Sequence, residues 1–418
     1  MKILILTQWY PPEPALLLQE LAQTLQEMDH QVTILTGFPN YPSGQLYPGY
    51  RLRFWQRENL AGVSVIRVPL YPDHSRSGAR RVLNYLSFAL SSAVLGSWLT
   101  PRPDAIFVYH PPLTVGLPAY VLSHLWRVPF VYQIQDMWPE TLQATGMLNN
   151  ERALGWVGRF AEWVYAHAGA VCTISPGFRD NLIQKGVPED KIHVISNWVD
   201  TSTYRVVPPD PARAQALGMA GKFNIMFAGN IGEAQGLEVL VDAAALLQDL
   251  QPVQFVVVGD GVALPRLRKA VEARGLSNVL FLGRYPTSAM PGLYTLADVL
   301  LIHLKDDALF RITIPHKTFA YMASGKPILA AVAGDAVDVV TLAGAGVTCP
   351  PENPEALAST VRQLYQMPAS KRRQMAERGL RAAQTTYSRK VVVAQIEQAL
   401  RSAVQEHRCQ KRYGLAGD

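Results

Sequence analysis

Two kinds of segment alternate along most of the chain. Short apolar runs, typical of buried strands, are separated by stretches whose apolar residues recur every three or four positions, typical of helices. The runs cover residues 2–7, 31–36, 63–68, 105–109, 130–134, 170–174 and 192–195, and then 223–228, 255–258, 279–282, 299–303 and 328–331. Continuous apolar strands alternating with helices predict parallel sheets covered on both faces. We therefore expect an α/β fold of two doubly wound, Rossmann-like domains.

A proline-rich stretch separates the two halves. Residues 204–211 read YRVVPPDP, which can continue neither a helix nor a central strand. We expect domains at 1–205 and 206–385, followed at 386–418 by a helix that returns to the first domain and a basic tail. Domains of this kind that face each other bind ligands at the carboxyl ends of their strands, so we expect the functional site in a shared cleft.

The most apolar segment, residues 82–99, allows three interpretations. Leucines, a valine and a tryptophan recur at helical spacing, whereas polar residues occupy another face: the first set is Leu83, Leu86, Leu90, Val94 and Trp98, and the second is Asn84, Ser87 and Ser91. This amphipathic pattern favours a helix packed into the core. A helix lying on a membrane surface and a membrane-spanning helix remain open alternatives.

The composition is that of a folded protein. The 418 residues are 49% hydrophobic and 17% charged, which excludes disorder as the main state. Cys172, Cys349 and Cys409 are far apart and belong to no zinc-type cluster, so we expect neither disulfides nor a metal. No signal peptide is apparent after Met1, and we expect a cytoplasmic protein.

The net charge of +6 is unevenly distributed. Lys and Arg number 15 against 15 Asp and Glu in residues 1–201, 12 against 14 in 202–361, and 12 against 4 in 362–418. This distribution argues against a nucleic-acid-binding protein, in which basic residues spread over a dedicated face. The basic carboxyl-terminal segment, if it lies near Arg76, Arg80 and Arg81, predicts a surface for an anionic membrane.

Two glycine-containing loops are candidates for phosphate binding. Gly229-Asn230-Ile231-Gly232 follows a strand directly and precedes a helix, where backbone amides can approach an anion. An ordinary tight turn is an equally good explanation of this loop. Gly259-Asp260-Gly261 ends the next strand but does not complete the dinucleotide fingerprint, so a dehydrogenase is not predicted.

Further charged residues lie between residues 306 and 317. Asp306 and Asp307 are adjacent, so their carboxylates diverge and do not predict a metal site. Arg311, His316 and Lys317 precede a helix expected from about Thr318. Cations there oppose the helix dipole unless an anion compensates them, which again favours a bound phosphate.

Taken together, these segments resemble family 4 of the GT-B retaining glycosyltransferases. The resemblance rests on FAGNIGEAQGLEVLVDAAALL, VVVGDG, NVLFLGRY, LADVLLIHLKDDALFRITIPHKTFAYMASGKPIL and AGAGVTCPPENPEAL in the second half, and on TQWYPPEP, QDMWPE, TISPGF and VISNWVD in the first. It covers nearly the whole chain. Within the family the sequence is most similar to bacterial fucosyl and N-acetylfucosaminyl transferases of surface polysaccharide and lipopolysaccharide synthesis.

The resemblance implies a role for each matching residue. The residues expected to bind the nucleotide-sugar donor are Gly229, Asn230, Gln235, Gly259, Asp260, Arg284, Tyr285, Arg311, Ile314, Pro315, His316 and Lys317. Lys317 is expected to contact a phosphate. His110 and Asp136 would face the transferred sugar, with Asp136 the best candidate for a base, and Gln135, Pro12 and Glu13 would border the acceptor. Two glutamates common in the family are replaced by Ile312 and Ala320, which removes the expected ribose contact.

The implied activity is a metal-independent, retaining transfer of a hexosyl group. The donor would be a UDP-sugar, with a GDP-sugar as the second choice, and the acceptor a lipid-linked saccharide met at the inner face of the cytoplasmic membrane; no cofactor is expected. Backbone amides and cations would stabilise the leaving diphosphate. A nucleotide-sugar epimerase of the same fold and a non-catalytic sugar-nucleotide-binding protein are the alternatives.

Overall fold

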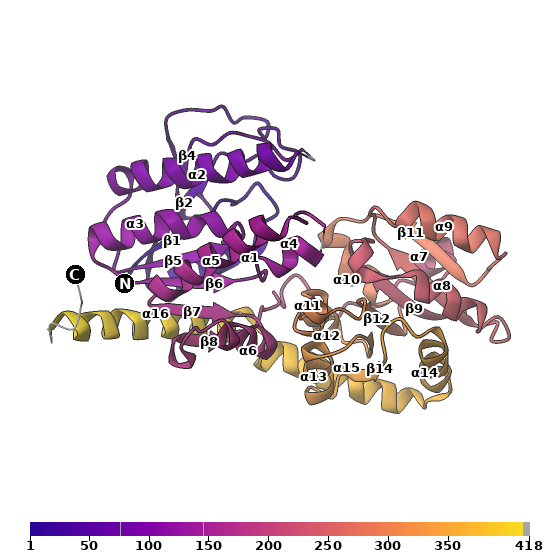
Figure 1. Cartoon of the computed structure of the whole chain (residues 1–418). Coiled ribbons are helices and arrows are strands. Elements are labelled where there is room, and N and C mark those ends of the chain that lie inside the picture. Colours follow the sequence, from indigo (N-terminus) through magenta and orange to yellow (C-terminus); the bar gives the residue numbers. More distant parts are fainter. Residues whose placement is uncertain (76, 145, 413–418) are drawn as a thin grey trace. The chain divides into compact units, whose positions relative to one another are not determined.

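The computed structural model describes residues 1–75, 77–144 and 146–412. The chain forms two compact units, one of Met1–Ser196 with Val392–Asp418 and the other of Asn197–Val391. Figure 1 shows a central sheet with covering helices in each unit.

The first unit contains an eight-stranded sheet in the order β3-β4-β2-β1-β5-β6-β7-β8. All neighbouring strands are parallel except β3 and β4. The strands are β1 (Lys2–Leu6), β2 (Gln31–Gly37), β3 (Gln56–Leu60), β4 (Val63–Val68), β5 (Ala105–His110), β6 (Phe130–Ile134), β7 (Ala170–Thr173) and β8 (Ile192–Val194). The helices are α1 (Leu16–Glu27), α2 (Gly78–Leu99), α3 (Gly116–Trp126), α4 (Glu140–Ala144), α5 (Glu151–His167), α6 (Pro176–Gln184) and most of α16 (Arg389–Arg412).

The second unit contains a six-stranded parallel sheet in the order β11-β10-β9-β12-β13-β14. The strands are β9 (Phe223–Ala228), β10 (Val253–Val258), β11 (Val279–Gly283), β12 (Val299–His303), β13 (Ile328–Ala331) and β14 (Gly346–Cys349). The helices are α7 (Pro211–Ala216), α8 (Glu238–Ala245), α9 (Leu264–Ala273), α10 (Met290–Tyr294), α11 (Ala308–Arg311), α12 (Lys317–Ala323), α13 (Asp335–Leu342), α14 (Pro354–Gln366) and α15 (Ala369–Thr385).

Both faces of the second sheet are buried. Phe255 and Val257 of β10 belong to one hydrophobic cluster, whereas Val256 and Val258 belong to another. Because successive strand residues point to opposite faces, the two clusters lie on opposite sides of the sheet. The prediction of two doubly wound α/β domains is confirmed.

Two strands were not predicted by the apolar pattern. β3 has the sequence QRENL and pairs with β4 alone at the edge of its sheet, and β14 is a four-residue edge strand, GVTC. Edge strands bury little apolar surface, so they leave no continuous apolar run in the sequence.

The first division between the units lies at 196/197, earlier than the predicted 205/206. Val199 donates its backbone amide to the Tyr387 carbonyl at 2.9 Å and forms a parallel bridge with Ser388. These pairings attach residues 197–204 to the second unit. The return to the first unit lies at 391/392 rather than 385/386, within α16.

Helix α2 does not bury its apolar stripe, which the interpretation as a core helix would require. Its inner face buries Asn84, Tyr85, Phe88, Ala89, Ser92 and Gly96. The apolar stripe is exposed, with exposed fractions from 42% at Leu86 to 88% at Trp98. Helix α2 is long and apolar enough to cross a membrane, but length and hydropathy alone do not distinguish a membrane span from the core helix of a soluble protein.

Hydrogen bonds explain why the polar face of α2 is inside. The Asn84 side chain donates to the Tyr71 carbonyl at 2.6 Å and accepts from Gln8 Nε2 at 2.6 Å. Gly96 permits close packing, because a Cβ there would lie 2.8 Å from Leu35 Cδ2 and 3.1 Å from Leu122 Cδ1. A leucine at position 84 could not form these hydrogen bonds, and a leucine at position 96 would not fit.

We predict that Asn84→Leu lowers the free energy of unfolding by about 2 kcal/mol, although it makes α2 more apolar, because it leaves buried polar groups without partners. The matched change Leu86→Asn, on the exposed stripe, should alter it by less than about 0.5 kcal/mol. Urea unfolding of both variants measures the difference. Equal effects would contradict the observed orientation of α2.

Candidate functional site

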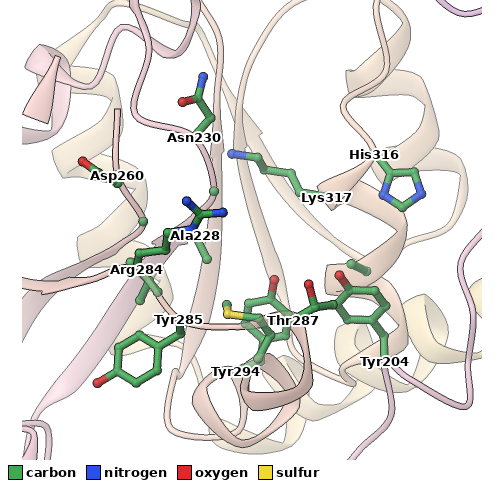
Figure 2. Close-up of a pocket in the computed structure, with 15 residues that line it drawn as sticks. Tyr204, Ala228, Asn230, Asp260, Arg284, Tyr285, Thr287, Tyr294, His316 and Lys317 are labelled. Atoms are coloured by element: carbon green, nitrogen blue, oxygen red, sulfur yellow. The ribbon is translucent and has the colours of Figure 1, made fainter. Parts of the chain in front are cut away.

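A cavity of about 480 Å³ lies in the second unit, where β9, β10 and β11 end and α12 begins. Its walls bring together backbone, cationic and aromatic groups from segments far apart in the sequence (Figure 2). It is lined by Tyr204, Ala228, Gly229, Asn230, Val258, Gly259, Asp260, Arg284, Tyr285, Thr287, Met290, Tyr294, His316, Lys317 and Ala320. The cavity thus lies at the carboxyl ends of parallel strands, as expected for this fold.

The two glycine loops interlock at the edge of the cavity. A Cβ on Gly259 would lie 1.9 Å from the Gly229 carbonyl oxygen, and one on Gly261 would lie 2.3 Å from the Ile231 carbonyl oxygen. Ile231 in turn donates its amide to the Asp260 carbonyl at 2.9 Å. Gly259 and Gly261 are therefore required for packing between the loops.

Gly229 has a different role from Gly259 and Gly261. A Cβ on it would lie 2.9 Å from Lys317 Nζ, and its φ of +145° is a conformation that other residues rarely adopt. The missing side chain makes room for the lysine amine beside the backbone. Gly229 and Lys317, both predicted to contact phosphate, thus lie next to each other.

The amine of Lys317 is the most unusual group in the cavity wall. Its Nζ is buried, and no hydrogen-bond partner for it exists among the described residues. It lies 3.7 Å from the centroid of the Phe227 ring, so a cation–π interaction partly replaces water. Burial lowers the pKa of Lys317 from 10.5 to about 7. An anionic ligand would restore the ordinary charge state.

Tyr321 fixes the lysine relative to the first glycine loop. Its buried hydroxyl accepts from the Ala228 amide at 2.9 Å and donates to the Ala228 carbonyl at 3.1 Å. Tyr321 lies on α12, one turn after Lys317, and Ala228 directly precedes Gly229. One side chain thus joins the end of β9 to the start of α12, the two elements that place Gly229 and Lys317.

Two further polar groups face the cavity near Lys317. Arg284 and Lys317 extend toward one another from opposite walls in Figure 2. His316 is open to solvent and donates through Nε2 to the Trp198 carbonyl at 3.0 Å. The surrounding protein lowers the pKa of His316 by desolvation, and the hydrogen bond opposes that shift. The imidazole is therefore neutral near pH 7.

Aromatic rings form the opposite part of the wall. The rings of Tyr204 and Tyr294 stack at 6.4 Å, and Tyr285 lies beneath the Arg213 guanidinium at 5.8 Å. Flat side chains next to cations can accommodate a planar group attached to a phosphate. The cavity therefore suits an anion that carries a flat ring.

Four residues predicted to bind the donor do not line the cavity. Gln235 accepts from the Gly232 amide at 3.0 Å and stabilises its own loop. Arg311 forms a two-pronged ion pair with Asp306, at 2.7 and 2.9 Å. Ile314 is buried in the hydrophobic core, and Pro315 precedes the lining segment. The neighbouring Asp307 caps α11 through the Leu309 amide at 2.8 Å.

Sequence reasoning missed several lining residues, among them Tyr204, Thr287, Met290 and Tyr294. Thr287 follows Tyr285 by two positions, so extending the loop after β11 would have included it. Tyr204 lies in the segment taken for a linker, and Tyr294 lies on the short helix α10, and neither position carries a local signal.

The predicted residues of the first unit lie near the carboxyl ends of β5 and β6. His110 is fully buried, and both of its ring nitrogens lack partners among the described residues. Burial lowers the pKa of His110 to about 3, so it is a neutral ring, in edge contact with Trp138 at 5.4 Å. Burial raises the pKa of Asp136, and Gln135 precedes it directly after β6.

Glu13 stabilises the backbone of two loops. One carboxylate oxygen accepts from the amides of Asn40 and Tyr41, at 2.9 and 2.8 Å, and the other accepts from the Tyr10 amide at 3.1 Å. Burial raises the pKa of Glu13 to about 7, although these hydrogen bonds act to lower it. These three hydrogen bonds give Glu13 a structural role, and its contact with an acceptor stays a prediction; the adjacent Pro12 is exposed.

Comparisons with known families match both halves of the chain. Residues 15–198 match the family described as "Glycosyl transferase 4-like domain", and residues 212–382 match "Glycosyl transferases group 1". The glycosyl transferase WcaI of Escherichia coli K12, assigned to colanic acid biosynthesis, is 30% identical over 88% of this chain and 93% of its own length.

Two further similarities are with a bacterial relative and a solved structure. The glycosyltransferase WbjE of Pseudomonas aeruginosa is 26% identical over 62% of this chain and 64% of its own. The structure of Anabaena Alr3699/HepE in complex with UDP has a TM-score of 0.72 at 20% identity, covering 96% of this chain and all of that one. The latter establishes a shared fold.

We predict that Lys317→Met has opposite effects on stability and on anion binding. Removing an unpaired buried amine should raise the free energy of unfolding of the ligand-free protein by about 2 kcal/mol, equivalent to about 6 °C in Tm. The same change should weaken pyrophosphate binding at least tenfold, measured by calorimetry. Lys326→Met is the matched control, because Lys326 is paired with the Thr295 carbonyl at 2.8 Å. It should lower Tm and leave binding unchanged; the same pattern for Lys317 would refute its role.

Proposed function

Because the chain belongs to the glycosyl transferases group 1 family, with a glycosyl transferase 4-like domain in its first half, we propose that it is a retaining GT-B enzyme that transfers a hexosyl group from a UDP-sugar. The observation that carries the proposal is the buried, unpaired amine of Lys317 beside Gly229 in the cavity of the second unit. That position suits a diphosphate.

UDP is proposed as the nucleotide because Alr3699/HepE, of the same fold, is a UDP complex. The uracil ring would lie among Tyr285, Thr287 and Tyr294, and the diphosphate would extend toward Lys317. A GDP-sugar is the second choice. Fucose or N-acetylfucosamine is our proposal for the sugar, from the resemblance in sequence.

Charge on the leaving UDP is the main barrier to breaking the anomeric bond. Lys317, protonated when a phosphate is bound, and Arg284 would stabilise that charge from opposite sides of the cavity without a metal ion. No protein base is obligatory, because the acceptor hydroxyl can pass its proton to the leaving phosphate. Asp136, whose raised pKa favours proton uptake, is the alternative.

The acceptor is proposed to be a lipid-linked saccharide. The relative WcaI is assigned to colanic acid biosynthesis, a polysaccharide pathway. An acceptor anchored in lipid requires the enzyme to work at the inner face of the cytoplasmic membrane, so we propose peripheral attachment of a cytoplasmic protein.

A panel of UDP-, GDP- and dTDP-sugars, each with and without a lipid-linked saccharide acceptor, tests the proposal. We predict sugar transfer from a UDP-sugar with retention at the anomeric carbon, and at least a hundredfold loss of kcat in Lys317→Met. Retention is read by nuclear magnetic resonance of the product. Conversion of the donor without acceptor would identify an epimerase instead, and binding without turnover a non-catalytic protein.

Binding of UDP-glucose should weaken as the pH rises. The pKa of Lys317 is about 7 in the free protein, so above that pH the amine must take up a proton to bind phosphate, and the dissociation constant should rise up to about tenfold per pH unit. UDP-glucose has no phosphate proton that titrates in this range, and desolvation shifts the pKa of His316 downward, away from it. Calorimetry at pH 6.5, 7.5 and 8.5 measures the slope, which Lys317→Met should abolish. A flat profile for the unmodified protein would contradict the assigned charge state.

A further inference from the structure

A second cavity, of about 300 Å³, lies in the first unit at the amino ends of the strands, whereas His110 and Asp136 lie near their carboxyl ends. It is bordered by Lys2 at the start of β1 and by the residues that precede β5 and β6. Six basic side chains line it: Lys2, Arg102, Arg127, His407, Arg408 and Lys411. This pocket and the carboxyl ends of the strands, where the transfer chemistry is expected, therefore lie at opposite ends of the sheet.

Within the part of the chain that the structure describes, the cations of this basic pocket outnumber its carboxylates. Its single carboxylate, Asp104, accepts the Lys2 backbone amide at 2.7 Å and joins β1 to the start of β5. Within residues 1–75, 77–144 and 146–412, no ion pair involves Arg102, Arg127, Arg408 or Lys411. Gathering like charges is unfavourable unless an anion binds among them.

The backbone holds these cations together. Arg127 has a left-handed conformation, with φ of +54°, at the end of α3. Its carbonyl accepts from both Lys411 Nζ at 2.6 Å and His407 Nε2 at 2.9 Å. Desolvation, together with Arg102 and Arg127, lowers the pKa of Lys411. The end of α16 is therefore fixed in the basic pocket by an uncharged acceptor, which leaves the positive charges available.

Exposed apolar side chains lie close in sequence to the arginines of the basic pocket. Trp98, 88% exposed, lies four residues before Arg102, and Leu125, 60% exposed, lies two residues before Arg127. Trp98 is the last residue of the exposed stripe of α2. The helix α2 itself packs against α3 (Figure 1). Soluble proteins rarely expose apolar patches of this extent unless a partner covers them.

A loop at the other end of the strands, before β3, repeats the combination of arginine and apolar groups. Residues 51–55 read RLRFW, and all five are exposed. The following Arg57 donates to the Leu99 carbonyl at the end of α2, at 2.8 Å, so the loop leads into a strand tied to that helix. Residues 30–103 contain eight Arg and no Lys, against one Asp and one Glu. The first unit thus has a strongly basic region that the charge of residues 1–201 as a whole conceals.

Other basic residues of the carboxyl-terminal segment have structural roles in the second unit. Arg362 forms an ion pair with Asp249, at 2.6 and 2.7 Å, and Arg372 donates to the Leu364 carbonyl at 2.7 Å. At the end of α16, Arg408 and Lys411 line the basic pocket of the first unit together with Arg102 and Arg127. The association of the whole basic segment with Arg80 and Arg81 stays a prediction. Arg76 lies outside the described residues.

We propose that the basic pocket binds the phosphate group of an anionic phospholipid and that the exposed stripe of α2 enters the same bilayer surface. A bilayer offers a partner for both features of this surface: negative phosphates for Arg102, Arg127 and Lys411, and an apolar layer for Trp98 and Leu125. The proposal specifies the surface behind the peripheral attachment proposed above, but it does not depend on the sugar transferred.

Co-sedimentation of the full chain with vesicles tests this surface. The vesicles contain phosphatidylcholine alone or with 30% phosphatidylglycerol, on the order of native anionic content. We predict that Arg102→Gln with Lys411→Gln weakens partitioning to the anionic vesicles about fivefold per cation, equivalent to about 1 kcal/mol each. Trp98→Ser should weaken binding to both kinds of vesicle. Lys371→Gln with Arg373→Gln, two exposed residues of α15, is the charge-matched control and should have no effect.

Two further measurements make the outcome decisive. UDP binding by each variant, which reports on the second unit, should be unchanged, so a failure of the membrane surface is distinguished from a failure of the transferase proposal. Inorganic phosphate at 10 mM, about a physiological level, should compete only weakly. Equal losses in the control variant, or saturable binding of free phosphate without vesicle binding, would overturn the lipid assignment.

Discussion

A positive charge without a counter-charge determines the architecture of the second unit's cavity. Lys317 Nζ is buried against the Phe227 ring and beside Gly229, with no carboxylate partner among the described residues. Such a group destabilises the empty protein, because desolvation is not repaid by pairing. It persists because Tyr321 binds both backbone groups of Ala228 and prevents α12 from moving away. Under the proposed function, a bound anion would supply the missing counter-charge, so removing the amine would change stability and anion binding in opposite directions.

Buried polar groups in the first unit act differently. Glu13 accepts three backbone amides and joins the loops after β1 and β2, and Asn84 joins α2 to the same region. These side chains have partners, so they determine structure. His110 has none among the described residues and lies at the end of β5. The contrast between partnered and unpartnered polar groups distinguishes the residues that support the strand ends from those available to a ligand.

The sequence predicted the central strands because both of their faces are buried, which makes their apolar runs continuous. It did not predict β3 and β14, whose edge positions need few apolar residues. For α2, periodicity identified two faces but not which one is inside, since that depends on the partners Gln8 and Tyr71 from distant segments. At the site, residues directly after strands were found, as Gly229, Asp260 and Arg284 show. Gln235 and Arg311 do not line the cavity, because each has an intramolecular partner that sequence spacing does not reveal.

The residue one turn after Lys317 explains why the lysine remains available. Ala320 lies on the same face of α12 and lines the cavity. A carboxylate at this position would be close enough to pair with the amine, since residues three apart on a helix are neighbours. Pairing would raise the pKa of Lys317 and neutralise the charge that the donor phosphate requires. In the resemblance described above, a glutamate of the family corresponds to Ala320. Alanine leaves Lys317 without this neighbour, so under the proposed function the phosphate of the ligand would be its counter-ion.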